Sequence, residues 1–270
     1  MKEWASGYVK SNGNDLFYTR TGGNKKPLLL AHGHTDDGAC WTEFAKLLED
    51  DYDVIMYDAI GHGKSARLTA GMEIDLGNDM KNVVEGLGLK KPAIWGHSMG
   101  AGTTVDYANT YAKEISLIIL EDVGWFDGDD TKLTSALALK PYKIADLQKG
   151  TMEEAIELSK KIHPRHKDSI HPYWASSKMN YDVAWVDRKF SPTKYPWREQ
   201  GPNLTCPTLL LTAENEKGGL MTPEVAVQAL GILPNGQWAY FPNAGHTIRY
   251  EQFDLVMGVV KNFLRHHYPA

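Results

Sequence analysis

Short, mostly apolar runs alternate with segments of helical periodicity along most of the 270-residue chain. The runs at residues 26–31, 52–57, 91–95, 115–120 and 207–212 have the length and apolar character of strands buried on both faces of a parallel sheet. Between them, apolar side chains recur every three or four positions, which predicts amphipathic helices. This alternation predicts an α/β fold with a mostly parallel, doubly wound sheet.

Other patterns complete this prediction. A Ser-Asn-Gly-Asn turn at residues 11–14 predicts a hairpin within residues 7–18. A final strand is predicted at residues 237–241. Helices are predicted over residues 41–48, 76–87, 101–112, 133–139, 152–162, 223–230 and 253–264.

The strand–helix alternation is interrupted between residues 124 and 202, where helical segments alternate with proline-containing breaks. We therefore predict a core formed by residues 1–123 and 203–270, with a helical cap inserted at residues 124–202. Several aromatic residues here are candidates for lining a largely apolar substrate pocket: Trp125, Phe126, Tyr173, Trp174 and Trp185. Packing into a small core of the cap itself is the alternative for each of them.

Composition narrows the possible functions without choosing one. Hydrophobic residues make up 42% and charged residues 23% of the chain, and the net charge is −5. No basic stripe indicates nucleic-acid binding, and no apolar run has the length of a membrane span. The first residues lack the apolar region of a secretory signal, and two lone cysteines form no disulfide framework. We expect a cytoplasmic protein, and the oligomeric state stays open.

The sequence Gly-His-Ser-Met-Gly at residues 96–100 fits the Gly-x-Ser-x-Gly pattern of a nucleophile elbow. It lies between a predicted strand and a predicted helix. In that setting a sharp turn lifts the Ser98 hydroxyl above the sheet edge, and small residues at positions 96 and 100 let the two backbones approach closely. The pattern alone is a weak signal, because glycine and serine are common.

Its context strengthens the signal. In open α/β sheets, function lies outside the carboxyl ends of the strands. Several residues able to carry chemistry fall at such strand ends: His32, Asp58, Ser98, Asp122, Glu216 and His246.

With these positions in place, the sequence resembles an α/β-hydrolase with a cap domain. The resemblance covers nearly the whole chain and rests on four segments in order. These are His-Gly at residues 32–33, Asp-Ala-Ile-Gly-His-Gly-Lys-Ser at 58–65, the elbow at 96–100, and Asn-Ala-Gly-His at 243–246. The set is specific for the superfamily but only weakly specific for a substrate, because one fold hosts many chemistries.

The resemblance implies that His246 is the general base that activates Ser98, since it follows the last strand. The other histidines fit this role less well. His32 and His62 match structural positions of the family, and His97 is the variable elbow position. The remaining candidates lie in the cap, where no complete ligand spacing predicts a metal site: His163, His166 and His171.

The carboxylate that orients His246 has three candidates. Family members read Thr-Gly-x-x-Asp after the penultimate strand, whereas residues 212–216 here read Thr-Ala-Glu-Asn-Glu. Glu216 therefore occupies the aspartate position and is the preferred acid. Glu214 becomes the acid if the loop register shifts, and Asp122 stands at a known alternative location in the superfamily.

The resemblance also implies an oxyanion hole formed by the backbone N–H groups of Met99 and His34. The His34 side chain is then free to line the pocket. Asp36 and Asp37 continue the same loop and are expected to be exposed. Asp58 and the loop around His62 are expected to order the neighbouring turns.

Together these residues predict a metal-free, cofactor-free serine hydrolase that cleaves a small carboxylic ester or lactone through an acyl-enzyme. The substrate is a small acyl compound with an apolar portion. Haloalkane dehalogenases and soluble epoxide hydrolases are excluded, because they need aspartate where Ser98 stands. A cofactor-free perhydrolase or a carbon–carbon bond hydrolase would use the same groups. A non-enzymatic ligand receptor on the same fold is the alternative from another class.

Overall fold

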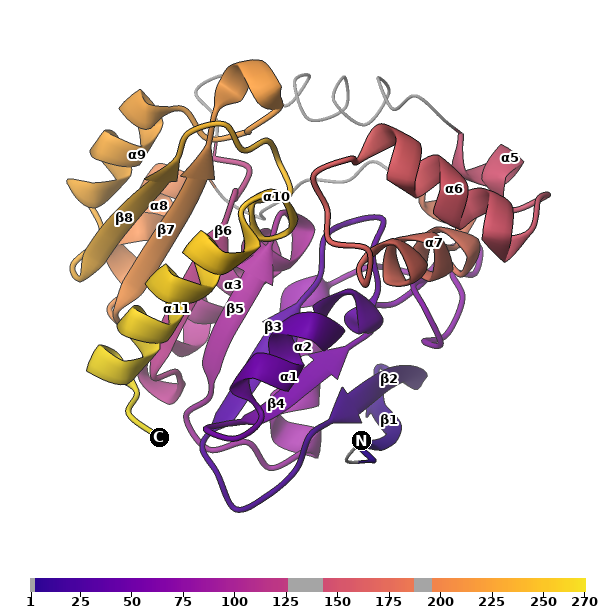
Figure 1. Cartoon of the computed structure of the whole chain (residues 1–270). Coiled ribbons are helices and arrows are strands. Elements are labelled where there is room, and N and C mark those ends of the chain that lie inside the picture. The colour runs from indigo at the N-terminus through magenta and orange to yellow at the C-terminus, as the bar shows by residue number, and fades with distance from the viewer. Residues whose placement is uncertain (1–2, 126–142, 187–195) are drawn as a thin grey trace.

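A single eight-stranded sheet organises the chain in the computed structural model, which describes residues 3–125, 143–186 and 196–270. The sheet is shown in Figure 1. Its strands are β1 (Ala5–Ser11), β2 (Asn14–Arg20), β3 (Pro27–Ala31), β4 (Asp53–Tyr57), β5 (Ala93–His97), β6 (Leu117–Glu121), β7 (Thr208–Ala213) and β8 (Gly236–Phe241).

The spatial order of the strands is β1-β2-β4-β3-β5-β6-β7-β8. The β1–β2 and β2–β4 pairs are antiparallel, and every pair from β4 to β8 is parallel. The predicted mostly parallel, doubly wound sheet is therefore confirmed. Because the parallel strands run in one direction, the loops after β3, β5, β6, β7 and β8 all emerge at the same sheet edge.

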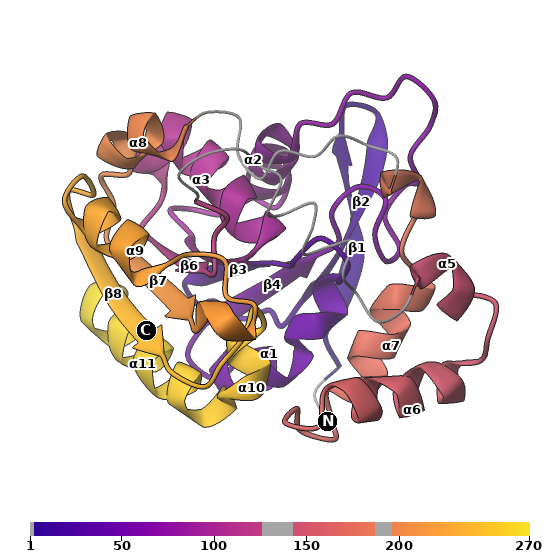
Figure 2. The ribbon, with the colours of Figure 1, turned by 90° about the horizontal axis from the view of Figure 1, so that it is seen from above.

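Helices cover both faces of this sheet, as Figure 2 shows. One layer contains α2 (Leu76–Gly86), α3 (Met99–Tyr111) and α9 (Pro223–Leu230); the other contains α1 (Thr42–Leu48), α10 (Ile248–Glu251) and α11 (Phe253–His267). Among the helices in the described ranges, none is long and apolar enough to cross a bilayer.

The sheet has a hydrophobic core on each face, and successive side chains of a strand point alternately into one core and the other. In β3, Leu29 and Ala31 belong to the core beneath α2 and α3, whereas Leu28 and Leu30 belong to the core beneath α1 and α11. All four are fully buried. Because successive strand side chains point to opposite faces, a continuous apolar run is what a doubly covered strand requires.

Helices α5 (Ile144–Leu147), α6 (Met152–Ile162) and α7 (His171–Met179) lie in the chain between β6 and β7 and form a group beside the sheet (Figure 1). They share a small core around Ala155, Trp174 and Ala175. A capping box starts α6: the Thr151 side chain accepts from Glu154 N, and the Glu154 side chain accepts from Thr151 N. The short helix α8 (Trp197–Gln200) packs on α3 instead.

Most predicted elements occur within a few residues of their expected bounds. The hairpin turn is present, with Asn12 and Gly13 at φ values of 49° and 82°. Such positive values are typical of the two central positions of a hairpin turn. The predicted helix at 152–162 coincides with α6. The helix predicted at 133–139 lies outside the described residues.

Asp79 on α2 joins this helix to β1. Its carboxylate accepts a hydrogen bond of 2.5 Å from the Ser11 hydroxyl, and the residue is 7% exposed. Burial raises the pKa of Asp79 to about 6, although the Ser11 hydrogen bond works in the opposite direction. The folded state therefore holds this proton more tightly than the unfolded chain, whose aspartate pKa is about 3.9. The stability that the protonated Asp79 carboxyl contributes is complete below about pH 4 and is lost as the pH rises through 6.

We expect Asp79→Asn to be more stable than the wild type at pH 8, by on the order of 2 kcal/mol, because the amide carries no buried charge. The advantage should disappear at pH 4. Urea unfolding at both pH values measures it, with the exposed Glu85→Gln on the same helix as the control. Lower stability of Asp79→Asn at pH 8 would contradict this account.

Candidate active site

Ser98 stands at the sharp turn between β5 and α3. Its backbone has φ 52° and ψ −113°, a region that residues with a Cβ rarely occupy. Met99 is the first residue of α3, and the Ser98 side chain makes no capping bond to this helix. The hydroxyl is therefore left for a partner outside the turn, at the positive end of the helix dipole.

Two glycines make this turn possible. A Cβ on Gly96 would collide with the backbone of Gly100, and a Cβ on Gly100 would collide with the backbone of Ala31. Strand β5, helix α3 and the end of β3 thus approach one another more closely than any side chain allows.

The structure brings Ser98, His246 and Asp122 into one hydrogen-bonded chain. The Ser98 hydroxyl lies 2.9 Å from Nε2 of His246, and Nδ1 of His246 lies 2.6 Å from Oδ2 of Asp122. Ser98 is 7% exposed, the Asp122 side chain is fully buried, and the imidazole is about one third exposed. In this arrangement Nδ1–H donates to the carboxylate, which leaves Nε2 to accept the serine proton.

The backbone aims the Asp122 carboxylate at His246. Asp122 directly follows β6 and has a φ of 47°. The backbone N–H of Leu220 donates to both carboxylate oxygens at 3.0 Å, and that of Met221 donates to Oδ1 at 3.3 Å. These bonds stabilise the negative charge of the Asp122 side chain, which is fully buried.

The other two carboxylate candidates lie elsewhere. Glu216, the preferred partner of His246 from the sequence, is exposed on the 3₁₀ turn η5 (Asn215–Lys217). Glu214 accepts from the backbone N–H of Asn243 at 2.8 Å and pairs with Lys217 at 3.1 Å. The preference for Glu216 is therefore corrected: the structure places Asp122 against the imidazole, because the loop after β7 turns its backbone N–H groups inward and Glu216 outward.

The turn at residues 33–36 lies after β3, next to the elbow. It is closed by a 3.0 Å bond from Asp36 N–H to the carbonyl oxygen of Gly33. Nδ1 of His32 lies 2.8 Å from the same oxygen, and Nε2 of His62 lies 2.5 Å from the carbonyl oxygen of His34. The backbone on both sides of His34 is therefore held in place.

His32 performs the structural role expected of it. Its Nε2 accepts from the backbone N–H of Ala59 at 2.9 Å, so it joins the loops after β3 and β4. Burial lowers the pKa of His32 to about 3. The neutral ring can donate from Nδ1 and accept at Nε2, as these two bonds require. Asp58 orders the same region by accepting from Gly38 and Lys64 N–H groups at 2.7 and 2.8 Å.

His97 connects the elbow to the loop that carries His246. Its Nε2–H donates to the backbone oxygen of His246 at 2.9 Å, and the two rings are 4.7 Å apart. A Cβ at Gly33 would lie 2.7 Å from Nδ1 of His97. Burial lowers the pKa of His97 well below its usual value, so the ring is neutral at physiological pH.

Asp36 and Asp37, expected to be exposed, are both buried. Burial works to raise the pKa of Asp36, but the charges of Lys178 and Arg249 outweigh it and hold this pKa below its usual range. Asp37 makes no such pair with any residue that the structure describes: burial and the negative charges of Asp58 and Asp36 raise its pKa to about 8. The charge of Asp36 is compensated by partners from distant segments, which its position on a loop does not indicate.

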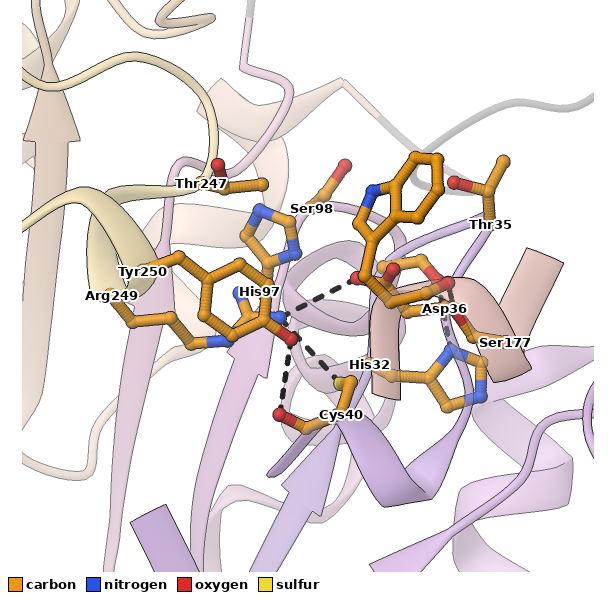
Figure 3. A network of polar contacts seen from close by, with 12 residues as sticks. His32, Thr35, Asp36, Cys40, His97, Ser98, Ser177, Thr247, Arg249 and Tyr250 are labelled. Carbon is orange, nitrogen blue, oxygen red and sulfur yellow. Dashed lines mark hydrogen bonds and ion pairs between the residues drawn. The ribbon is translucent and has the colours of Figure 1, made fainter. Parts of the chain in front are cut away.

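These partners form a buried ionic network beneath the site. Lys178 Nζ lies 2.6 Å from Oδ1 of Asp36, and Arg249 Nη2 lies 3.5 Å from Oδ2. Arg249 also reaches Glu121, both through Nη1 at 3.3 Å and through its backbone N–H at 3.0 Å. Figure 3 shows Asp36, Arg249 and Cys40 together below Ser98 in that view. No sequence motif points to these residues; the only local signal is that Glu121 ends an apolar strand.

The segment after α7 lies against the His34 side chain. The hydroxyl of Tyr181 is 3.2 Å from Nε2 of His34, and the Trp185 ring stands edge-on to the imidazole at 5.3 Å. The Trp185 indole N–H donates to the backbone oxygen of Ile60 at 3.0 Å. The His34 side chain is thus flanked by two aromatic side chains of this segment.

The candidate pocket residues have different surroundings. Trp185 adjoins His34, and Trp125 stacks on Trp197 within the main core. Trp174 belongs to the small core of α6 and α7, and Tyr173 lies close to Lys46 of α1. Phe126 lies outside the described residues.

The three histidines of the α6–α7 region lie together. The rings of His163 and His166 stack at 4.5 Å, and Nδ1 of His171 lies 2.9 Å from the Ser159 hydroxyl. Within the described ranges, no group of three or more His, Cys, Asp or Glu residues is arranged to hold a metal ion. His166 and His171 are buried, so they are not surface residues.

Comparison with known protein families identifies the family to which the chain belongs. Residues 26–252 match the family model described as alpha/beta hydrolase fold. The chain belongs to this family. The matched range contains the elbow, His246 and Asp122, so the hydrogen-bonded chain of this hydrolase lies within the family's shared core.

Individual relatives are distant but similar over their full length. The chain is 24% identical to N-formylmaleamate deformylase of Pseudomonas putida, over 97% of each protein. It is 23% identical to a 2-hydroxy-6-oxononadienedioate/2-hydroxy-6-oxononatrienedioate hydrolase of the same species, over 93% of this chain and 92% of the relative. A solved carboxylesterase of Bacillus subtilis superimposes with a TM-score of 0.74 at 20% identity, covering 97% of this chain and 92% of that one. The structural likeness shows the shared hydrolase fold.

Substitution of Gly96 in the elbow tests whether this hydrolase requires the close approach of β5 and α3. We expect Gly96→Ala to lose about 3 kcal/mol or more in free energy of unfolding, because the added methyl group meets backbone that cannot move aside. Gly258→Ala on α11 is the matched control, since its Cβ would meet open space. The control should gain about 0.5–1 kcal/mol from helix propensity. Equal urea midpoints for Gly96→Ala and the wild type would show that the close approach is not required.

Proposed function

We propose that this hydrolase cleaves a small carboxylic ester or lactone through a covalent acyl-enzyme on Ser98. The observation that carries the proposal is the continuous hydrogen-bonded chain from Ser98 through His246 to Asp122, with distances of 2.9 and 2.6 Å. A serine hydroxyl is a weak nucleophile at neutral pH, and an adjacent, correctly oriented base is what activates it.

In the first step, Ser98 Oγ attacks the substrate carbonyl carbon while Nε2 of His246 takes the hydroxyl proton. The imidazolium that forms is stabilised by the buried Asp122 carboxylate at Nδ1. The same proton then passes from Nε2 to the leaving oxygen as the carbon–oxygen bond breaks. With an ester, the alcohol leaves and the acyl group stays on Ser98; with a lactone, the ring opens and the new hydroxyl stays on the acyl group bound to Ser98.

The tetrahedral intermediate places a negative charge on the former carbonyl oxygen. The backbone N–H groups of Met99 and His34 are the proposed donors to this oxygen. Met99 is the first residue of α3, so its N–H has no partner one turn earlier in the helix. Pre-positioned donors of this kind each lower the barrier by about 3 kcal/mol.

Deacylation repeats the chemistry with water. His246 removes a proton from water, the hydroxide oxygen attacks the acyl carbon, and the bond to Ser98 Oγ breaks as Oγ regains the proton. Every group that this scheme uses is a side chain or backbone N–H of the chain, so the scheme needs no cofactor.

Residues 124–202 are proposed to act as the cap over this site. Tyr181 and Trp185 bring aromatic surface against His34, next to the proposed oxyanion position. Such a boundary favours a compact substrate with an apolar portion. The relatives named above include a deformylase and a hydrolase of an oxo-acid, so carbon–carbon or amide bond cleavage by the same residues is the second candidate.

We expect Ser98→Ala to lower kcat for p-nitrophenyl acetate and butyrate by at least about 10³-fold, because no acyl-enzyme can form. The fold should be unchanged, as circular dichroism can verify. A fluorophosphonate probe should label the wild type and not the variant. Full hydrolysis by Ser98→Ala would refute the nucleophile, and an unlabelled, folded wild type would indicate a receptor. A parallel panel of lactones and vinylogous diketones ranks the ester against the carbon–carbon alternative.

A matched pair of substitutions tests which carboxylate orients His246. Asp122→Asn should lower kcat roughly 10³- to 10⁴-fold, because an amide favours the wrong tautomer of His246. Glu216→Gln should leave kcat within about twofold, since Glu216 is exposed and the imidazole contacts Asp122. Steady-state kinetics on the same ester measure both. The reverse ranking would reinstate Glu216 as the acid.

A further inference from the structure

The direction of the His34 N–H depends on how the turn at residues 33–36 is held. In a trans peptide the N–H of one residue points opposite to the preceding carbonyl oxygen. The Gly33 oxygen is held by Asp36 N–H at 3.0 Å and contacts Nδ1 of His32 at 2.8 Å. The position of Asp36 therefore helps to fix the direction of the His34 N–H.

Lys178 reaches this turn from α7, outside the sheet domain. Its ammonium group donates to the Thr35 carbonyl oxygen at 2.7 Å, to Asp36 Oδ1 at 2.6 Å and to the Ser177 hydroxyl at 3.3 Å. An ammonium group has three protons, so all of them are used. The Lys178 residue is 2% exposed, and its contacts are shielded from water. Asp36 and Ser177 are among the labelled residues of Figure 3.

Arg249 is a second cation beside Asp36, but it lies farther from the carboxylate than Lys178 does. Arg249 is the other positive charge on Asp36, at 3.5 Å, and it is shared with Glu121 at 3.3 Å. The Thr35 carbonyl oxygen lies on the Lys178 side of the turn, where it accepts from the ammonium group at 2.7 Å. Lys178 thus makes the short contacts that join α7 to both Thr35 and Asp36.

We propose that Lys178 is a positioning residue, which holds the 33–36 turn so that the His34 N–H faces the oxyanion formed at Ser98. The inference rests on the proposed function. It assigns to a residue of α7 a role in stabilising the transition state, in addition to any role in enclosing the substrate. The effect is exerted through Thr35 and Asp36, so Lys178 itself touches no reacting atom.

The test is Lys178→Met, which keeps most of the length of the unbranched side chain and removes its three donors. We expect kcat for p-nitrophenyl butyrate to fall about 10- to 100-fold, with KM within about threefold, because the loss falls on the transition state. The inhibition constant of butylboronic acid, whose adduct with Ser98 is tetrahedral, should rise by a similar factor. A purely structural role would lower the thermal midpoint and leave kcat per folded molecule and boronate affinity unchanged, which would overturn the proposal.

Two further variants keep the test decisive. Lys167→Met is the matched control, because Lys167 also joins the α6–α7 region to a core aspartate, Asp254, at 2.9 Å, but at the surface. Its kcat should equal that of the wild type. The double variant Asp36→Asn/Lys178→Met removes one negative and one positive charge together, so it avoids a lone buried charge if Lys178→Met does not fold. It should fold and keep a low kcat, because the bond from Lys178 to the Thr35 carbonyl oxygen is still missing. A wild-type kcat would show that Lys178 only balances charge and would overturn the proposal.

The two proposals fail in different ways. If the wild type hydrolyses none of the esters, the proposed function fails, and the rate at which a fluorophosphonate modifies Ser98 replaces kcat in the comparison of Lys178→Met with the wild type. A slower modification then supports the positioning role, and an equal rate overturns it. If wild-type turnover is lost in Ser98→Ala but unchanged in folded Lys178→Met, the function stands and the positioning role fails.

Discussion

The close approach of β5, α3 and the end of β3 is the constraint on which the rest of the site depends. Only glycine fits at positions 96 and 100, because a Cβ at either would collide with backbone. This approach forces Ser98 to a φ of 52° and lifts its hydroxyl out of the helix that follows. The strained conformation persists because the two apolar cores on either side of the sheet hold the strand and helix in place. The Ser98 hydroxyl is thus positioned by packing that extends far beyond it.

A second constraint is electrostatic. Glu121, Asp36, Lys178 and Arg249 are all buried, and their two negative and two positive charges balance. Buried pairs of this kind add little net stability, whereas removing one partner costs about 3–5 kcal/mol. Their value here lies in what they join: Glu121 precedes Asp122, Arg249 follows His246 by three residues, and Asp36 follows His34 by two. Each charge fixes a loop at the edge where the strands end, and Lys178 ties the α7 region to that edge.

Local signals in the sequence predicted the elements, and the resemblance to α/β-hydrolases implied the contact between Ser98 and His246. Other contacts between distant segments were not predictable. The elbow glycines, the hairpin turn and the apolar strands each depend on neighbours within a few residues. Asp36 was expected to be exposed because a charged loop residue usually is, and its partner Lys178 is 142 positions away. Glu216 was the preferred acid because it occupies the family's aspartate position after β7, whereas Asp122 follows the adjacent strand β6. What separates them is the positive φ of Asp122 and the inward N–H groups of Leu220 and Met221, neither of which has a sequence signature.

The loop after β7 still serves the site, although it does not supply the carboxylate that contacts His246. Its backbone donates to Asp122, and Glu214 accepts the N–H of Asn243, three residues before His246. Lys217 donates to the Asn243 side chain at 2.8 Å, and a Cβ on Gly245 would collide with the Lys217 carbonyl oxygen. The loop therefore lies between β6 and the histidine loop and contacts both. Because the carboxylate that contacts His246 follows β6, the β7 loop supports Asp122 with backbone N–H groups and the histidine loop with side chains. Glu214 there serves as a hydrogen-bond acceptor for a backbone N–H.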